Sequence, residues 1–384
     1  MKRRKLLMIP GPIEFEPAVM RAMGSQTTSH VAPSFVESFG HCLDMMKEVW
    51  MCPAGQPFIV AGTGTLAMDM AGANLIEPGD AALVISTGYF GERFAALLER
   101  YGAEVTVLKA ATGQVVPAEA IESELKKKPY KLMTFTHVDT STAVHVDPVS
   151  IGQLGKKYGV LTVLDGVCSV AGEEIRQQEW GIDVVLTASQ KAIGVPPGLA
   201  LLVASERAME TWRSRKEPVR NYYADWGNWL PIMEAYAERR PAYFGTPAVN
   251  LVAALEVSLG QILSEGMQAR FDRHKQLAGA FRAAMGALGL QMIPEQNVSA
   301  NTLSAVYYPE GVDAADFIKA MSSSGVIVAP GLLPELKTRY FRVGHMGSVS
   351  QADLLATVGA IGVAMQQCGH ACTPAKALEK LLVV

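Results

Sequence analysis

A lysine and an acid stand where α/β proteins carry their chemistry. Lys191 follows the apolar run Val184–Ala188 and precedes a turn rich in Gly and Pro. Partial desolvation of a lysine at this place favours the neutral amine that a Schiff base needs. Asp165 ends the apolar run Val160–Leu164, and open α/β sheets bind ligands at the carboxyl ends of their strands. Taken singly, both have ordinary alternatives: a surface lysine and a carboxylate that caps a helix.

The third chemical element is a glycine-rich loop. Residues Ala61–Ala67 read Ala-Gly-Thr-Gly-Thr-Leu-Ala, after an apolar run and before a helical pattern. Glycines let the backbone approach an anion, and a helix N-terminus supplies free N–H groups, so the loop suits a phosphate. It also fits the dinucleotide fingerprint G-x-G-x-x-A, and a plain glycine-rich turn is a further alternative. The sequence lacks the Gly-Lys-Ser/Thr ending of a nucleoside triphosphate loop at this place.

The three elements together indicate pyridoxal 5′-phosphate (PLP). Its phosphate needs a cradle, its pyridinium nitrogen needs an acid, and its aldehyde needs a lysine. Asp165 and Lys191 follow neighbouring expected strands. They are therefore expected to reach opposite ends of one cofactor.

The ordered motifs resemble those of class V, fold-type I PLP-dependent aminotransferases of the alanine–glyoxylate / serine–pyruvate type. The resemblance covers nearly the whole chain and implies an α/β fold. Its large domain holds a mostly parallel, seven-stranded mixed sheet, and a smaller C-terminal α+β domain follows. The motifs that carry it are Ile9–Pro12, Ala61–Thr65, Thr136–Thr142, Glu179–Asp183, Ser189–Ala192 and Arg342–Gly347.

The resemblance implies two catalytic residues. Lys191 is expected to form the Schiff base and to move a proton, and Asp165 to pair with the pyridinium nitrogen. Thr140 would contact the O3′ side of the ring, and Phe90 would stack on it at a position where many relatives have Trp. The expected phosphate ligands are Thr63, Gly64, Thr65 and Gln190.

Further roles concern the substrate and a second subunit. Tyr243 and Thr246 match residues that reach the phosphate of the neighbouring subunit, which implies a homodimer with shared active sites. Arg342 matches the arginine that binds the substrate α-carboxylate, a role suited to a planar guanidinium. Gly11 matches a residue that approaches the substrate and limits its side chain. No motif identifies a second arginine for a dicarboxylic substrate; the candidates left open are Arg93, Arg239 and Arg240.

The expected reaction is a ping-pong transamination through Lys191. L-Alanine, or L-serine, would donate the amino group to glyoxylate or pyruvate; alanine and glyoxylate would give pyruvate and glycine. The alternatives are a serine–pyruvate or serine–glyoxylate aminotransferase, a cysteine desulfurase, a nicotinamide-dependent dehydrogenase and a non-enzymatic binding protein. A desulfurase needs a mobile nucleophilic cysteine, whereas Cys368 and Cys372 are expected at a C-terminal helix end.

Composition narrows the partners. The chain has 384 residues, of which 49% are apolar and 18% charged, and its net charge is −3. These values suggest about two domains and argue against a nucleic-acid partner. No apolar run has the roughly 20 residues that span a membrane, and the cysteine spacing predicts no metal site. We expect a cytoplasmic protein by default, although this family also has peroxisomal and mitochondrial members.

Apolar periodicity predicts the elements that position these residues. The organisation expected is an N-terminal segment (1–20), a large PLP-binding domain (21–265) and a small C-terminal domain (266–384). Helices are expected over Leu66–Leu75, Glu92–Tyr101, Pro117–Lys127, Asn250–Gly286 with a break at Gly266, Ala314–Ser323 and Gln351–Gln367. Strands are expected over Phe58–Ala61, Ala82–Ser86, Glu104–Leu108, Leu132–Thr136, Val160–Leu164, Val184–Ala188, Leu199–Ala204, Leu303–Tyr308, Val326–Ala329 and Tyr340–Val343.

Overall fold

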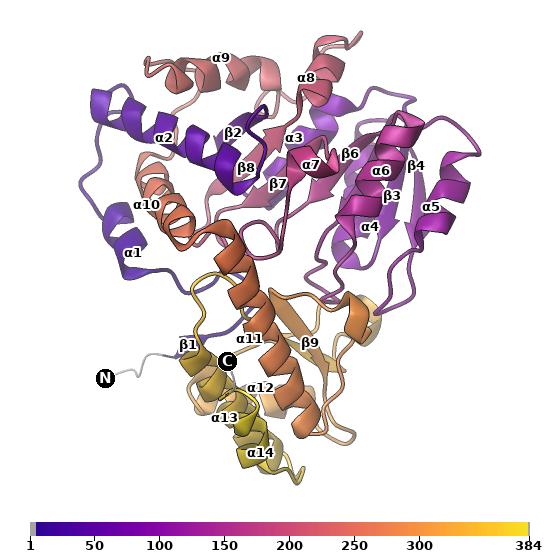
Figure 1. Cartoon of the computed structure of the whole chain (residues 1–384), viewed down its shortest axis with the longest axis vertical. Helices are drawn as coiled ribbons and strands as arrows, with labels where there is room; N and C mark the ends of the chain where they lie inside the picture. The colour runs from indigo at the N-terminus through magenta and orange to yellow at the C-terminus, as the bar shows by residue number, and fades with distance from the viewer. Residues whose placement is uncertain (1–4, 383–384) are drawn as a thin grey trace.

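The computed structural model describes residues 5–382 and contains the expected mixed sheet. Within this range the large sheet has seven strands in the order β2-β8-β7-β6-β5-β3-β4 (Figure 1). In chain order they are β2 (Gln56–Ala61), β3 (Ala81–Ser86), β4 (Glu104–Lys109), β5 (Leu132–Thr136), β6 (Leu161–Asp165), β7 (Val184–Ala188) and β8 (Leu199–Ala204). β8 runs antiparallel to both neighbours, and all other pairs are parallel. Every residue of β5 to β8 is buried, as in sheets covered on both faces.

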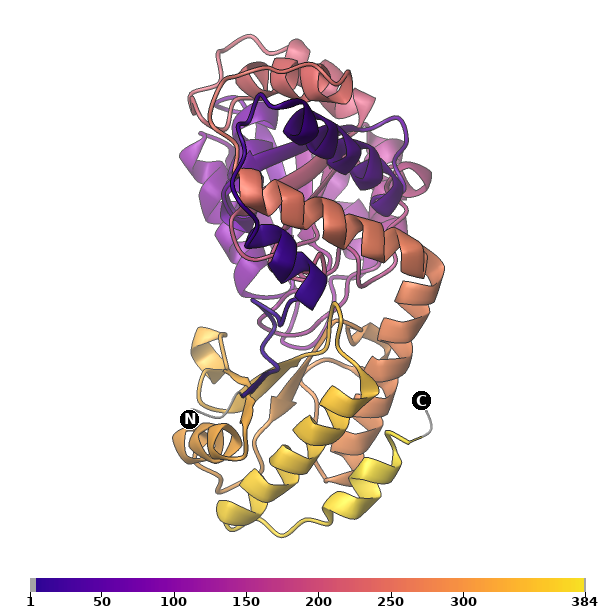
Figure 2. The same ribbon diagram turned by 90° about the vertical axis from the view of Figure 1, so that its left-hand side faces the viewer.

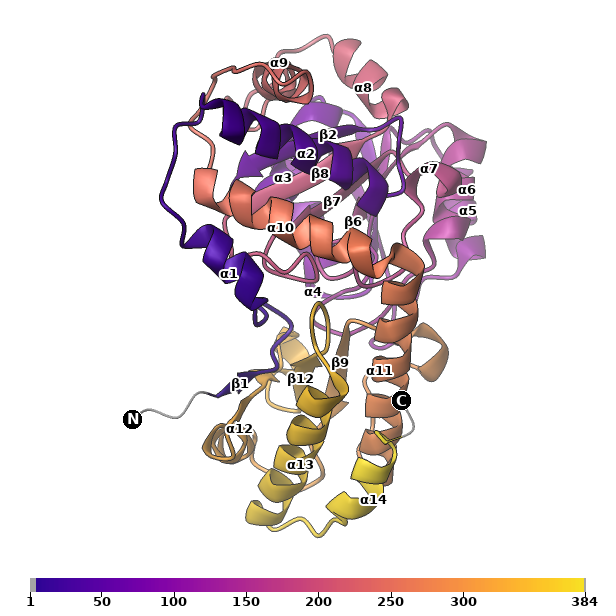
Figure 3. The same ribbon diagram turned by 60° about the vertical axis from the view of Figure 1, so that its left-hand side comes forward.

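Helices cover this sheet. α3 packs on β7 and β8, and α4 packs on β3, β4 and β5. α2 and α10 lie side by side across one face (Figure 3). α6 shows the local logic: Asp147 caps its N-terminus, Pro148 opens it, and Gly159 in the left-handed region ends it. The helices of this unit are α1 (Pro17–Met23), α2 (Pro33–Val49), α3 (Gly64–Leu75), α4 (Tyr89–Arg100), α5 (Ala118–Leu125), α6 (Pro148–Tyr158), α7 (Gln177–Trp180), α8 (Glu206–Arg213), α9 (Trp226–Ala237) and α10 (Val249–Glu265).

The C-terminal part forms a second, smaller unit. Its antiparallel sheet has the order β11-β12-β9, and β1 pairs in parallel with β10. Its own apolar cluster is separate from that of the large sheet. The strands are β1 (Leu6–Leu7), β9 (Leu303–Tyr307), β10 (Val326–Ile327), β11 (Ala329–Pro330) and β12 (Tyr340–Gly344). The helices are α11 (Met267–Ala287), α12 (Ala314–Ser323), α13 (Gln351–Gln367) and α14 (Pro374–Glu379), with the 3₁₀ turns η1 (Gln296–Val298) and η2 (Pro334–Leu336).

Two segments of chain connect the units (Figure 2). On one side α10 ends at Glu265 and α11 begins at Met267, with the predicted break at Gly266, whose φ is +84°. On the other side the N-terminal segment pairs with the small unit through β1 and then reaches the large unit, where Ile13 N donates to Gln190 O at 3.2 Å. The segment 6–13 therefore touches both units beside the predicted lysine.

Two expectations for the C-terminal part are wrong in detail. The run Val326–Ala329 is not one strand: β10 pairs with β1, and β11 pairs with β12, because the chain changes sheets between them. Cys368 caps the end of α13 as expected, but Cys372 lies in the turn before α14, where Gly369 has a φ of +81° and Pro374 opens the next helix. The described residues form no helix that is long and apolar enough to cross a membrane.

Candidate active site

One cavity of about 190 Å³ gathers most of the predicted cofactor residues. It opens where β5, β6 and β7 end and where α3 and α4 begin, because the carboxyl ends of parallel strands meet at one edge. The predicted residues that line it are Thr63, Gly64, Thr65, Phe90, Thr140, Asp165, Gln190 and Lys191.

Lys191 lies in a short loop after β7 that is held from both sides. Ser189 Oγ donates to Pro196 O at 2.8 Å and accepts from Leu199 N at 3.2 Å, which fixes the loop that presents the lysine. The Lys191 side chain is buried, and its Nζ donates to the carbonyl of Pro10. The amine therefore points toward the N-terminal segment at the cavity wall.

Gly11 lies against this lysine. A Cβ at Gly11 would lie 2.5 Å from Lys191 Cδ and 2.8 Å from its Nζ. Gly11 also has a φ of +115°, which side-chain-bearing residues rarely adopt. Both observations require glycine at this position.

Asp165 ends β6 and is only 2% exposed. Burial raises the pKa of its carboxyl to about 7, and the nearby charge of Asp139 adds to this shift. The hydrogen bond that Val167 N donates to Oδ1 at 3.0 Å opposes the shift, as do the charges of Lys191 and Arg93. A carboxylate this poorly solvated gains much from a cationic partner. This end of the cavity is therefore suited to a cationic group of a ligand.

The N-terminus of α3 forms the opposite wall. Thr63 is its N-cap residue, and no side chain caps the helix, so the first N–H groups of α3 face the cavity without an intrahelical partner. A Cβ at Gly64 would lie 2.8 Å from Val167 Cγ2, so glycine permits this close approach. An uncapped helix start at a cavity is suited to an anion.

A buried acid, Asp139, holds Phe90 and the turn that carries Thr140. Asp139 Oδ2 accepts from Phe90 N at 3.1 Å, and its Oδ1 accepts from Ser141 N at 2.8 Å. Burial raises the pKa of Asp139 above its usual value, although these N–H donors oppose the shift. Thr140 Oγ1 lies 2.8 Å from Cys168 Sγ, so the cavity also contains a thiol.

Arg342 is a buried cation beside this cavity. It lies on β12 and is 9% exposed. Its Nη1 donates to Thr140 O at 3.1 Å and its Nε to Pro330 O at 3.0 Å. Among the described residues no carboxylate forms an ion pair with it, and burial lowers its pKa. A buried guanidinium bonded only to carbonyl groups is prepared for an anion.

Four predicted residues do not line this cavity within one chain. Gly11 and Arg342 contact residues that line it, whereas Tyr243 and Thr246 lie elsewhere. Tyr243 and Thr246 lie on the loop before α10, where the Tyr243 side chain is 63% exposed and packs near the ring of His30. Their expected place at a neighbouring subunit stays a prediction.

The structure distinguishes the three arginines that were candidates for binding a second substrate carboxylate. Arg239 pairs with Asp44 at 2.7 Å and with Glu37 at 3.4 Å, and Arg240 pairs with Glu238. Arg93 lines the cavity, although it belongs to the exposed surface of α4. Its spacing from Phe90, one helical turn, is the sequence signal that could have placed it there.

His137 does not enter the cavity, although Thr136 and Val138 on either side of it do. Its Nε2 lies 3.0 Å from His145 Nε2, and burial lowers its pKa well below the usual value. This histidine therefore lies outside the reacting space.

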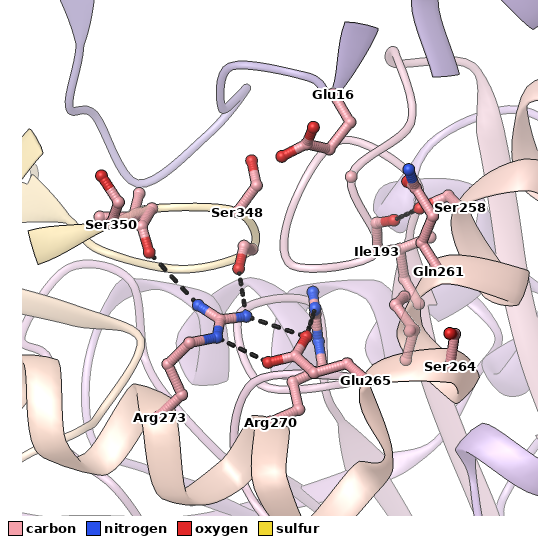
Figure 4. Close-up of a pocket in the computed structure, with 14 residues that line it drawn as sticks. Glu16, Ile193, Ser258, Gln261, Ser264, Glu265, Arg270, Arg273, Ser348 and Ser350 are labelled. Atoms are coloured by element: carbon pink, nitrogen blue, oxygen red, sulfur yellow. Dashed lines mark hydrogen bonds and ion pairs between the residues drawn. The ribbon is translucent and has the colours of Figure 1, made fainter. Parts of the chain in front are cut away.

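A larger cavity of about 450 Å³ lies at the corner between α10 and α11 (Figure 4). Its arginines are already paired: Arg270 Nη1 lies 2.7 Å and Arg273 Nε 2.6 Å from Glu265. Arg270 also donates to Ala192 O and Arg273 to Gly347 O. Because both arginines of this larger cavity already form ion pairs and hydrogen bonds within the chain, we take the smaller cavity as the candidate site.

Unpartnered polar atoms indicate what the smaller cavity holds. Within the described chain, the buried atoms Thr136 Oγ1 and Gln190 Oε1 have no hydrogen-bond partner, and both residues line the cavity. Buried polar groups are normally paired, so these side chains fit a polar ligand. An amine, an acid and an uncapped helix start surround the same space, and these groups match PLP. Fold and cavity thus define the class of protein, a fold-type I PLP enzyme.

Comparison with known proteins narrows the class to a family. The family model described as aminotransferase class-V matches residues 24–333. Alanine–glyoxylate aminotransferase 1 of Saccharomyces cerevisiae is 40% identical over 356 residues, which cover 89% of this chain and 91% of the yeast protein. The chain therefore belongs to the class V aminotransferases and is PLP-dependent.

Solved structures agree. The ureidoglycine–glyoxylate aminotransferase of Bacillus subtilis superposes with a TM-score of 0.93 at 26% identity, covering 100% of this chain and 98% of that one. The alanine–glyoxylate aminotransferase of a Nostoc species gives a TM-score of 0.90 at 29% identity, covering 95% and 96%. The relatives use different amino donors, so the family fixes the reaction type and leaves the donor open.

Proposed function

We propose that this enzyme transfers the amino group of L-alanine to glyoxylate, giving pyruvate and glycine. L-Serine is the alternative donor and pyruvate the alternative acceptor. The yeast relative, 40% identical over most of both chains, is named for alanine and glyoxylate. Both substrates are small and carry one carboxylate.

The observation that carries the proposal is the free, buried charge of Arg342 beside the cavity. A guanidinium binds one carboxylate in a bidentate manner, and burial strengthens the contact. L-Alanine and glyoxylate each present such a group. Binding it at Arg342 would orient the amino or carbonyl carbon toward Lys191.

Lys191 and Asp165 would do the chemistry. Bound PLP supplies an electron sink for the substrate's α-carbon. Lys191 would attach the cofactor through Nζ, then take the proton from the α-carbon once the substrate displaces it. Asp165 would keep the proton on the ring nitrogen, because its buried carboxylate is stabilised by that positive charge.

The remaining cavity residues would hold the cofactor. We assign the phosphate to the α3 N-terminus and Gln190, the O3′ side to Thr140, and the ring face to Phe90. At the start of α3 the ligands would be the N-cap residue Thr63 and the first helical residues Gly64 and Thr65. The Gly11 backbone lies against Lys191, and we assign it the role of limiting the size of the substrate side chain.

A homodimer would complete the site. Tyr243 and Thr246 lie on an exposed loop, away from the cavity of their own chain. We assign them to the cofactor phosphate of a second subunit. Cys368 and Cys372 lie near α13 and outside the cavity, which offers no support for a desulfurase.

Half-reactions measured separately test this function. The holoenzyme is mixed with L-alanine without an acceptor, and we expect about one pyruvate per subunit, because a ping-pong enzyme stops after half a cycle. Adding glyoxylate should then release glycine and restore the visible spectrum. L-Serine and L-aspartate serve as comparison donors. If L-alanine yields no pyruvate while either comparison donor reacts, the proposed donor is wrong.

A further inference from the structure

Arg93 shares one face of α4 with Phe90. Residues three apart on a helix lie on the same side, and both side chains line the cavity. Arg93 Nη2 donates to Thr65 Oγ1 at 3.0 Å. Thr65 lies in the first turn of α3, so the guanidinium stands at the helix start that we assign to phosphate.

Arg93 forms no ion pair among residues 5–382, although its charge acts on the Asp165 carboxyl. Its neighbour Glu92 forms an ion pair with Lys109 instead. A guanidinium has five N–H donors, and only the bond to Thr65 engages the Arg93 head group within the described residues. A cation in this state at a cavity rim can accept an anion without losing an existing ion pair.

A phosphate in this cavity needs such a cation. A phosphate monoester carries about 1.5 to 2 negative charges at neutral pH, whereas a helix N-terminus supplies roughly half a positive charge. Lys191 is committed to the aldehyde end, and Asp165 adds a negative charge at the ring nitrogen. The α3 N-terminus alone therefore leaves the phosphate under-compensated.

We propose that Arg93 is a cofactor-binding residue that completes the phosphate site from α4. The inference rests on the placement of the PLP phosphate at Thr63–Thr65 proposed above. The guanidinium bonds the phosphate while Thr65 holds it in place. The competing role for Arg93 is to bind the side-chain carboxylate of a dicarboxylic substrate. The test below distinguishes this role from phosphate binding.

The test measures binding of PLP to the apoenzyme, which needs no turnover, and separately the reaction of the holoenzyme with L-aspartate. The variants are Arg93→Met, which removes the charge, and Arg93→Lys, which keeps it without the planar fork. Arg100→Met on the exposed far end of the same helix is the matched control. Tryptophan fluorescence gives the dissociation constants for PLP and for pyridoxal, which lacks the phosphate, and inorganic phosphate serves as the competitor.

We expect Arg93→Met to weaken PLP binding about 10- to 100-fold and pyridoxal binding less than about threefold. Arg93→Lys should fall between, and inorganic phosphate should compete less well in Arg93→Met. Unchanged PLP affinity, or equal loss for PLP and pyridoxal, would overturn the proposal. So would a variant that keeps its PLP affinity and loses only the reaction with L-aspartate. A wrong amino donor would leave all these constants unchanged, so the two proposals fail separately.

Discussion

Replacing Asp165 with asparagine should stabilise the cofactor-free protein while it removes the proposed chemistry. Asp165 is fully enclosed at the end of β6, and burial raises its pKa from 3.8 to about 7. Asparagine has nearly the same shape, and its Oδ1 can keep the bond from Val167 N. The substitution therefore removes a titrating group with little change in packing.

The sign and the pH window follow from linkage. Because the native carboxyl holds its proton up to about pH 7 and the unfolded one only to about pH 4, the contribution of Asp165 to wild-type stability is full below pH 4. It falls as the pH rises to 7 and is then level. The loss amounts to about 4 kcal/mol, since one pKa unit is worth about 1.4 kcal/mol. An asparagine side chain does not titrate, so Asp165→Asn should gain that much over wild type across this window.

The assay is urea unfolding of the wild-type and Asp165→Asn apoenzymes, measured side by side at several pH values from about 4.5 to 8. Other titrating groups are common to both proteins and cancel in the difference between midpoints. We expect the midpoint of Asp165→Asn to rise above that of wild type with increasing pH and to stop rising near pH 7. A difference that is constant with pH, or a variant that loses stability as pH rises, would refute the reasoning.

Three other substitutions test contacts around the site. Gly11→Ala should lower kcat by at least about 100-fold, because its Cβ would lie 2.5 Å from Lys191 Cδ and displace the amine; steady-state kinetics checks this. Arg342→Gln should raise KM for both the amino and the keto acid about 10- to 100-fold, since each loses a charged hydrogen-bond partner. Glu265→Gln should lower the free energy of unfolding by on the order of 2 kcal/mol, because Arg270, 8% exposed, loses its acid. Urea titration measures this last effect.

Each of these substitutions has a control or a contradicting result. Gly79 has a φ of +88° and open space around it, so Gly79→Ala tests backbone strain without crowding and should leave kcat unchanged. Arg339→Gln, on the exposed chain before β12, should leave both KM values alone. Burial raises the pKa of Glu265, but its contacts with Arg273 and Arg270 outweigh burial and hold this pKa below its usual value. The Glu265 contribution should therefore be present above pH 4.5 and lost in acid, so Glu265→Gln should lower stability less in acid than at neutral pH. A destabilisation that is as large in acid as at neutral pH contradicts the ion-pair account.

Much of the site was predictable because it lies at the ends of buried strands. The apolar runs before Asp165 and Lys191 are β6 and β7, and the glycine-rich loop opens α3 as predicted. Burial on both faces makes such strands continuous in apolar residues, which is a strong local signal. The ordered set of motifs resembles the class V family, and this resemblance predicted the other lining residues, such as Phe90, Thr140 and Gln190.

Other features depend on contacts between distant segments. Arg93 is an exposed helical arginine in the sequence pattern, and only the packing of α4 beside α3 brings it to Thr65. β10 and β11 split one apolar run, because their partners come from different sheets. α2 was not predicted, although its buried residues recur every three or four positions. The division of domains at residues 265 and 266 stays a prediction, which the break at Gly266 and the two apolar clusters favour.

The most direct test of the central claim asks which lysine carries the cofactor. Holoenzyme is treated with borohydride, which fixes PLP to its lysine, and the digested protein is mapped by mass spectrometry. We predict a single pyridoxyl modification, on the peptide that contains Lys191, and its absence in Lys191→Ala. Modification of a different lysine, or none in protein that has bound PLP, would contradict the assignment of this cavity as the active site.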